Sequence, residues 1–237
     1  MATILCLNSG SSSLKFALFE GRTPGDEELP EPLLSGVLEA TRDGPRCTLT
    51  TAEGTSETRR PDITAGKVDE EVRWLLGLLR ERKETTTPPA VVAHRIVHGG
   101  TRYTEAVVVT SEILSDLDAL TPFAPLHQPP GLQGIRTATA LLPEALQVAC
   151  FDTAFHAGHP EVEARYPLPR VWYERGYRRY GFHGLSYASV ARRLPRLLGG
   201  RVEGSWSPIS EAGRACADFA TSGVSRPPWV SPLSTGS

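Results

Sequence analysis

Alternation of apolar and polar residues predicts the first strands of the chain. Residues 3–7 and 14–20 have strand character, and Leu14, Phe16 and Leu18 fall on one face of the second run. The polar connection Asn-Ser-Gly-Ser-Ser-Ser separates the two runs. We therefore expect an N-terminal hairpin whose connecting turn consists of small polar residues.

The strand pattern continues as a meander. Residues 33–40 and 46–51 are shorter strand candidates, and the Asp-Gly-Pro sequence between them is a turn signal. A helix is expected next, because apolar residues recur at helical spacing from Val68 to Leu79. Acidic residues at its start and basic residues at its end suit the helix dipole.

The remaining pattern alternates between strands and helices. It predicts strands over residues 90–97 and 147–152 and helices over residues 111–120 and 132–142. Strands followed by alternating helices and strands indicate an α/β domain with a mixed sheet.

Composition supports a globular fold and excludes several classes of protein. The 237 residues are 40% hydrophobic and carry a formal net charge of -2, so nothing indicates binding to nucleic acid or to an anionic membrane. The four cysteines lie far apart with no C-x-x-C pair, which supports neither a zinc cluster nor a disulfide framework. Without a signal-peptide pattern or an apolar run of transmembrane length, we expect a soluble, cytoplasmic protein with reduced thiols.

Residues 8–15 form the first candidate binding segment. Glycine and small hydroxyl residues allow backbone N–H groups to approach an anion, and Lys15 adds a positive charge. The segment is not a Walker A loop, because it lacks both the G-x-x-x-x-G-K-[ST] spacing and a following helix. An ordinary serine-rich turn is the alternative interpretation.

Arg95 lies at the end of a predicted buried strand, shortly before Gly99 and Gly100. A guanidinium group at the carboxyl end of a strand is well placed to bind a carboxylate or a phosphate. The alternative is an interface salt bridge with solvated histidines.

Three later segments carry further candidates. The Pro-rich residues 124–130, which include Leu126, can wall a small pocket or simply begin a helix. Asp152 follows a buried strand, where it can hold a catalytic group or a metal-bound water, or cap the next helix. His183 lies between glycines, where it can donate to developing negative charge or simply face water. No Ser/His/Asp or Cys/His arrangement supports nucleophilic hydrolysis.

Five motifs occur in a specific order over residues 1–198: LNSGSSSLKF, HRIVHGG, APLHQPPGLQGI, FDTAFH and RRYGFHG. Together they resemble the acetate kinase family of the actin-like ATPase superfamily. The resemblance implies an actin-like ATPase (ribonuclease H-like) fold with a cleft between two α/β domains. It also implies transfer of a phosphoryl group from ATP to acetate, which gives ADP and acetyl phosphate, with Mg²⁺ or Mn²⁺ as the cofactor.

The resemblance assigns the phosphate side of the site to the first motif. Asn8 resembles the asparagine of the family's magnesium site. Ser11, Ser13 and Lys15 resemble the loop that contacts the nucleotide phosphates.

The resemblance assigns the acid side of the site to the later motifs. Arg95 resembles the arginine that binds the substrate carboxylate, and Val97 and Leu126 resemble the walls of the pocket for the acetate methyl group. His183 resembles the histidine that stabilises the transition state, and Asp152 matches the residue described as proton donor or acceptor. Acetate is already ionised near pH 7 and needs no base, so we expect Asp152 to orient Arg95 or a metal-bound water.

The chain departs from the family after Gly199-Gly200. The family's glycine-rich H-x-G-N-G segment, second catalytic arginine and distant magnesium-site glutamate have no counterpart. We therefore divide the chain into an N-terminal domain (1–152), the start of an incomplete nucleotide-binding domain (153–200) and a non-family tail (201–237). Ser, Pro and Gly supply 16 of the tail's 37 residues, and Arg outnumbers Lys 22 to 3 in the chain. These biases favour a disordered or frameshifted tail.

These observations favour a chain that encodes part of an acetate kinase and is inactive alone. A non-catalytic relict or interaction module is one alternative, and specificity for propionate or butyrate is another. The expected partners are the small molecules acetate and ATP. The family's homodimer forms mainly through the C-terminal domain, which is missing here, and we expect exposed apolar surface after residue 152.

Overall fold

A computed structural model describes residues 2–10, 12–21, 30–82, 87–197, 205–210 and 214–219 of the chain. The chain divides into two compact units, Met1–Phe182 and His183–Ser237. Among the described residues, no helix has both the length and the apolar character needed to cross a membrane.

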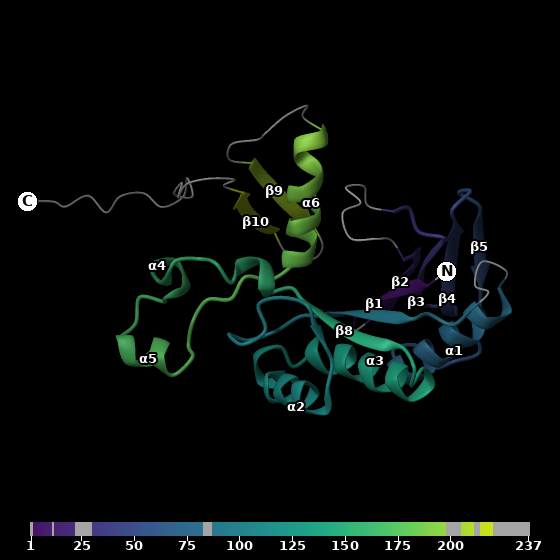
Figure 1. The fold of residues 1–237 in the computed structure, drawn as a ribbon, viewed down its shortest axis with the longest axis horizontal. Coiled ribbons are helices and arrows are strands. Elements are labelled where there is room, and N and C mark those ends of the chain that lie inside the picture. The colour runs from purple at the N-terminus through teal and green to yellow at the C-terminus, as the bar shows by residue number, and fades with distance from the viewer. Residues whose placement is uncertain are drawn as a thin grey trace, which may run out of the picture. The chain divides into compact units, whose positions relative to one another are not determined.

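An eight-stranded mixed sheet forms the centre of the first unit (Figure 1). Its strand order is β5-β4-β3-β2-β1-β6-β8-β7. The first five strands form an antiparallel meander, β1, β6 and β8 run parallel to one another, and β7 pairs antiparallel with β8. The strands are β1 (Thr3–Ser9), β2 (Ser13–Glu20), β3 (Leu34–Thr41), β4 (Gly44–Thr51), β5 (Ser56–Arg59), β6 (Val91–Ile96), β7 (Val107–Val108) and β8 (Leu146–Phe151).

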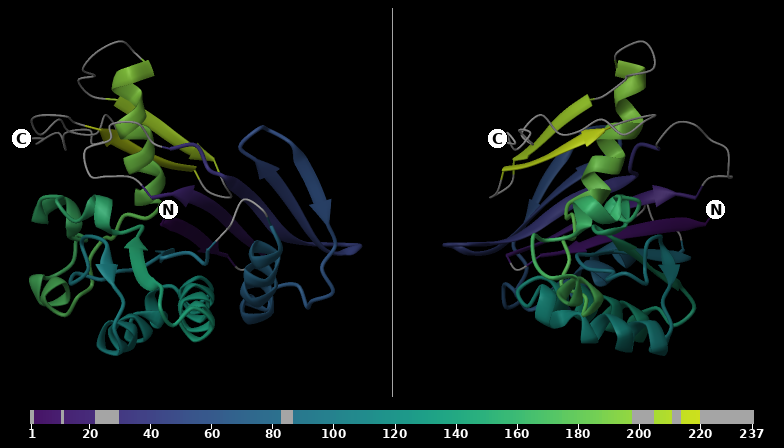
Figure 2. Two further views of the ribbon diagram at one scale, coloured as in Figure 1. Left: turned by 45° about the vertical axis from the view of Figure 1, so that its right-hand side comes forward. Right: turned by 90° about the vertical axis from the view of Figure 1, so that its left-hand side faces the viewer.

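Three longer helices lie on one face of this sheet (Figures 1 and 2). They are α1 (Val68–Glu81), α2 (Ser111–Ala119) and α3 (Gln128–Leu141). Shorter helical segments are η1 (Thr121–Phe123), η2 (Ala154–His156), α4 (Glu161–Ala164) and α5 (Arg170–Glu174).

Two apolar clusters fill the space between the sheet and the helices. The larger cluster joins the inward faces of β1 to β4 with α1 and the end of α3. The smaller cluster joins β6 and β8 with α2 and the middle of α3. Leu14, Phe16 and Leu18 are all buried in the larger cluster, so the predicted alternation in the N-terminal hairpin is confirmed.

The predicted α/β class with a mixed sheet is confirmed, and the principal strands and helices lie close to their predicted positions. One boundary is wrong, because α3 begins at Gln128 and not at Leu132. Pro129 and Pro130 occupy the first helical turn, where a missing N–H donor costs little. Part of the proline-rich segment 124–130 thus begins a helix, which was one of the two interpretations of this segment.

The second unit contains α6 (Gly184–Leu197) and an antiparallel pair of strands, β9 (Ser205–Ser210) and β10 (Arg214–Phe219). The expectation that residues 201–237 are a disordered or frameshifted tail stays a prediction. The rest of that tail lies outside the described residues.

Candidate active site

The carboxyl ends of the parallel strands β1, β6 and β8 meet at one edge of the sheet. Asn8 lies near the end of β1, Arg95 near the end of β6, and Asp152 directly after β8. Crevices at the carboxyl ends of parallel strands are the usual ligand sites of α/β sheets. The topology therefore brings together three predicted residues that are far apart in the sequence.

Arg95 is the centre of this cluster. Its Nε donates to both oxygens of Asp152, at 3.2 and 3.1 Å, and its Nη2 donates to Asp152 Oδ2 at 2.7 Å. Its Nη1 donates to Asn8 Oδ1 at 3.1 Å. Four contacts with two side chains hold the plane of the guanidinium group in one orientation.

Burial differs strongly between the two charged partners. The Asp152 side chain is 2% exposed, whereas the Arg95 side chain is 31% exposed. The arginine is therefore the member of the pair that a solvent-borne anion can reach. Both carboxylate oxygens of Asp152 accept from Arg95, an arrangement that suits the expected role of Asp152 in orienting Arg95, and that role stays a prediction.

The Ser-rich turn lies beside this cluster. The Gly10 N–H donates to the Ser13 carbonyl at 2.9 Å and closes the turn between β1 and β2. Lys15 pairs in register with Asn8 in the neighbouring strand, so both side chains lie on the same sheet face. Ser13 is half-buried at the start of β2, and Ser11 lies outside the described residues.

His94 lies on the opposite face of β6, toward the helices, and is buried. Its Nε2 lies 2.9 Å from Gln147 Oε1, a contact in which the ring nitrogen donates to the amide oxygen. Burial lowers the pKa of His94 to about 4, against a small opposing effect of this hydrogen bond. His94 is therefore a neutral structural residue near pH 7.

The loop that follows Arg95 is fixed by side chains from two other elements. Gln128, fully buried at the start of α3, accepts from the His98 backbone N–H at 3.1 Å. Its Nε2 donates to the His98 carbonyl at 3.0 Å and to the Leu117 carbonyl at 3.2 Å. Thr153 Oγ1 accepts from the Gly99 N–H at 3.0 Å, which ties this loop to the residue after Asp152.

Aromatic side chains surround the buried His98. Its ring centroid lies 5.4 Å from that of Phe123, 4.4 Å from that of Tyr180 and 5.8 Å from that of Phe182. The Gly100 N–H donates to His98 Nδ1, and burial lowers the pKa of this histidine, so the neutral ring carries its proton on Nε2. This aromatic cluster was not predicted from the sequence, although two of its members lie in the RRYGFHG motif.

The two predicted pocket-wall residues differ in exposure. Val97, two residues after Arg95 in the sequence, is half-buried, whereas Leu126, two residues before the start of α3, is 73% exposed. Both lie in segments fixed by Gln128 and by the first turn of α3. Their role as walls of an acid pocket stays a prediction.

The FDTAFH and RRYGFHG motifs contact each other. His156 Nε2 donates to the Phe182 carbonyl at 3.0 Å. A Cβ atom at Gly181 would overlap the His156 ring, so glycine is required for this approach. The contact fixes the chain directly before His183.

His183 is the first residue of the second unit. Its carbonyl accepts from the Ser186 and Tyr187 N–H groups at the start of α6. Its φ of 57° is the one positive value at a non-glycine residue in the described part of the chain. Such a backbone conformation is uncommon for histidine and often marks a constrained functional position.

The residues of this cluster do not form a complete magnesium site. Asn8 Oδ1 and both Asp152 oxygens already accept from Arg95. Within the described ranges, no group of three or more His, Cys, Asp or Glu side chains can hold a metal ion. Mg²⁺ requires several oxygen ligands in octahedral geometry, which these residues alone do not supply.

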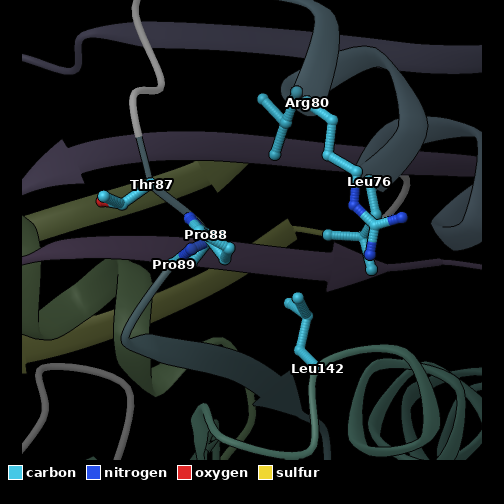
Figure 3. Close-up of a pocket in the computed structure, with 7 residues that line it drawn as sticks. Leu76, Arg80, Thr87, Pro88, Pro89 and Leu142 are labelled. Carbon is cyan, nitrogen blue, oxygen red and sulfur yellow. The ribbon is translucent and has the colours of Figure 1, made fainter.

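A small pocket lies elsewhere in the first unit, between the end of α1 and the end of α3 (Figure 3). Its volume is about 120 Å³, and it is lined by Leu76, Leu79, Arg80, Thr87, Pro88, Pro89 and Leu142. It contains none of the predicted site residues. The candidate active site is therefore the strand edge around Arg95.

Comparison with known proteins identifies the family. The model of the acetokinase family matches residues 3–207, which is most of the chain. The chain belongs to the acetokinase family. The resemblance inferred from the five motifs is thus confirmed.

Relatives in this family match at similar levels of identity. The acetate kinase of Methylocella silvestris is 40% identical over 228 residues, which cover 94% of this chain and 54% of the relative. The acetate kinase of Streptomyces coelicolor is 42% identical over 198 residues, which cover 83% of this chain and 47% of the relative. The chain therefore spans about half the length of the acetokinase relatives it matches.

Solved structures of acetokinases confirm the fold. The acetate kinase of Porphyromonas gingivalis superposes with a TM-score of 0.76 at 30% identity, covering 93% of this chain and 55% of that protein. A propionate kinase from Francisella tularensis superposes with a TM-score of 0.77 at 29% identity, covering 91% and 54%. The predicted actin-like ATPase fold is thereby confirmed, with about half of the family's length present.

Proposed function

We propose that this chain supplies the acid-binding half of an acetate-kinase-type phosphotransferase site. The observation that carries the proposal is the orientation of Arg95. Its guanidinium group is fixed by the buried Asp152 and by Asn8, yet it remains partly open to solvent. A fixed, accessible guanidinium at the carboxyl ends of parallel strands is suited to a carboxylate ligand.

In the proposed reaction, one acetate oxygen attacks the γ-phosphorus of ATP. A new oxygen–phosphorus bond forms as the bond to the β-phosphate oxygen breaks, and ADP leaves with that electron pair. Both reactants are anions, so the site must supply fixed positive charge and not a base. Arg95 holds the carboxylate in this scheme, and Asp152 orients Arg95.

Other residues of the chain take the remaining roles in the proposal. In the proposal Ser11, Ser13 and Lys15 contact the nucleotide phosphates, and His183 donates to the charge that develops on the transferred group. Val97 and Leu126 contact the hydrocarbon end of the acid. Asn8 orients Arg95 and contributes to a metal site that needs ligands from outside these residues. The acid is proposed as acetate, with propionate as the alternative because of the propionate kinase match.

We propose further that the chain is inactive alone, because it spans about half the length of its relatives. The same observation favours a second candidate function, a non-catalytic module that binds the acid without turnover. Both candidates predict acid binding at Arg95. They differ only in whether turnover appears when the second half of a relative is supplied.

Binding of ¹³C-labelled acetate to the 237-residue chain tests the proposal. We expect NMR line broadening of acetate that is lost in Arg95→Gln and weakened in Arg95→Lys, because lysine keeps the charge but not the planar fork. Arg46→Gln is the matched control, since Arg46 forms an exposed ion pair on β4. Equal broadening by the Arg95→Gln variant, with its fold verified by circular dichroism, would contradict the proposal.

A phosphoryl-transfer assay then separates the two candidate functions. The second half of the Methylocella silvestris acetate kinase would be added as a separate polypeptide. Acetyl phosphate formation by the mixture supports the phosphotransferase, whereas binding without turnover supports the module. Turnover by the chain alone would show that the claim of inactivity is wrong.

A further inference from the structure

A buried amide at the start of α3 contacts the loop of residues 97–100 that follows Arg95. The Gln128 side chain accepts from the His98 N–H through its oxygen, at 3.1 Å, and donates to the His98 carbonyl through its nitrogen, at 3.0 Å. One side chain therefore holds the peptide groups on both sides of His98. The same nitrogen donates to the Leu117 carbonyl at 3.2 Å, so Gln128 joins this loop to α2 as well as to α3.

Water cannot replace these contacts, because the groups that make them are enclosed. Gln128 is 0% exposed and His98 is 1% exposed. A buried peptide group that loses its partner must stay unsatisfied or move toward solvent, and either outcome costs free energy. The loop therefore keeps its position only while the amide is present.

The position of the amide is itself fixed, because α3 begins in close contact with the end of β6. A Cβ atom at Gly131 would lie 3.0 Å from the Ile96 side chain and 3.4 Å from the Arg95 carbonyl. Gln128 lies three residues earlier, in a first helical turn whose two prolines restrict the backbone. A helix holds a side chain more precisely than a loop does.

Val97 is the side chain whose position these contacts control. Burial alternates along β6 and just beyond it, so Val97 lies on the same side as Arg95, whereas Ile96 and His98 are buried on the other side. The His98 N–H that Gln128 binds belongs to the peptide group between Val97 and His98. In the proposed function, Val97 contacts the hydrocarbon end of the acid, so the loop determines how much room that end has.

The Arg95 guanidinium group is held by different residues. Its four contacts described above involve Asp152 and Asn8, and none of these four involves Gln128. Separate sets of contacts thus position the groups for the two ends of a bound acid. A change at Gln128 should alter the fit of the hydrocarbon end and leave carboxylate binding in place.

We propose that Gln128 is a positioning residue that determines which acid the site accepts. It holds the loop of residues 97–100, and thereby Val97, so that an acid one methylene longer than acetate fits less well. Thr153 is a weaker second anchor of this loop, with one hydrogen bond, from the Gly99 N–H. The inference rests on the proposed function, because it requires acid binding at Arg95.

NMR titrations of the 237-residue chain with acetate and with propionate test the inference. Gln128→Met keeps the length of the side chain but removes its amide. For this variant we expect the affinity for propionate to rise at least about threefold relative to that for acetate. Burial of one more methylene is worth roughly fourfold in affinity once Val97 can move aside.

The ratio of the two dissociation constants separates positioning from stability. An unfolded fraction lowers the apparent affinity for both acids equally, so a purely structural role of Gln128 leaves the ratio unchanged. Gln133→Met places the same substitution at an exposed position of α3. Val72→Ala destabilises the larger apolar cluster, away from the loop. Neither control should change the ratio.

Two variants at Thr153 provide a second test, which does not require Gln128→Met to fold. Thr153→Val removes the acceptor of the Gly99 N–H and should shift the ratio in the same direction by a smaller factor. Thr153→Ser keeps the hydroxyl group and should retain the ratio of the wild-type chain. If Gln128→Met folds and keeps the wild-type ratio, or if Val72→Ala shifts the ratio as much, the inference is wrong. If Gln128→Met does not fold, an unchanged ratio in Thr153→Val overturns it.

Failure of this inference can be told apart from failure of the proposed function. If the wild-type chain binds neither acid, the proposed function is contradicted and the inference falls with it. If Arg95→Gln abolishes binding of both acids while Gln128→Met leaves their ratio unchanged, only the role of Gln128 is overturned.

Discussion

His94 and Arg95 are adjacent in β6, yet they lie on opposite faces of the sheet in opposite surroundings. His94 is buried toward the helices, neutral, and paired with the uncharged amide of Gln147. Arg95 is charged, partly exposed, and paired with a buried carboxylate. One strand thus contributes to the core with one residue and to the candidate site with the next.

The difference follows from the period of a β-strand. Successive side chains point to opposite faces, so a functional group can alternate with core residues without interrupting the core. On the helix-facing side, an uncharged pair avoids the cost of burying charge. On the other side, a charge is retained because solvent and the Asp152 carboxylate both compensate it.

The largest expected effect comes from breaking the Arg95 pair. Arg95→Gln should lower the free energy of unfolding by about 3–5 kcal/mol, because it leaves the Asp152 carboxylate buried without its cation. The double variant Arg95→Gln with Asp152→Asn should recover much of this loss, since it removes both charges. Urea unfolding followed by circular dichroism measures both values. A double variant no more stable than the single one would show that burial of the charge is not the cause.

The next largest effect is a pH dependence of the free energy of unfolding, caused by His94 on the helix-facing side of the sheet. The folded-state pKa of His94 is lowered to about 4 from an ordinary value of 6.5, so the unfolded chain binds the proton first. As the pH falls from 6.5 to 4, this histidine alone should reduce the free energy of unfolding by up to about 3 kcal/mol. Above pH 6.5 it is neutral in both states and contributes no dependence.

Urea midpoints at pH 7 and pH 5 for the wild-type chain and His94→Asn measure this contribution. Other groups titrate in both proteins. The contribution of His94 is therefore the difference between the two proteins in how far the urea midpoint falls from pH 7 to pH 5. An equal fall of the urea midpoint in both proteins would contradict the neutral, buried state of this histidine.

A smaller effect is expected for the Gln128 clamp, by which we mean the three hydrogen bonds between Gln128 and the His98 N–H, the His98 carbonyl and the Leu117 carbonyl. Gln128→Leu should cost about 2 kcal/mol, because it leaves the His98 N–H and two carbonyl groups without partners. Gln133→Leu is the matched control, since Gln133 is exposed on the same helix. Thermal or urea unfolding of the two variants gives the comparison, and equal costs would show that the clamp adds no stability.

The smallest effect is expected for an exposed ion pair whose closest contact has the same length as that of the Arg95 pair. The Arg46–Glu39 pair has its closest contact at 2.7 Å, as does Arg95–Asp152, but its side chains are 46% and 41% exposed. Arg46→Gln should therefore change the free energy of unfolding by less than about 1 kcal/mol. A cost equal to that of Arg95→Gln would mean that distance, and not burial, decides the strength of these pairs.

Local sequence patterns predicted the elements that repeat a period over several residues. The alternation of Leu14, Phe16 and Leu18 gave the correct buried face, and the spacing from Val68 to Leu79 gave α1. The helices α4 and α5 have four and five residues, too short to show a period. β5 and β7 were missed for the same reason.

The site residues were predictable as individual positions but not as a network. Arg95 and Asp152 followed from their places at strand ends, yet the contact between Arg95 and Asn8 joins residues 87 positions apart. That contact depends on the strand order β1-β6-β8, which no local pattern contains. The Gln128 clamp likewise depends on the packing of α3 against the loop after β6.

The strand order has a consequence for how copies of this molecule can meet. The two edges of the sheet are β5, with four residues, and β7, with two. Short edges offer few unpaired backbone groups for another chain to extend the sheet, and β5 also carries a glutamate and an arginine. Edge-to-edge pairing of this sheet with a strand of another chain is thereby disfavoured.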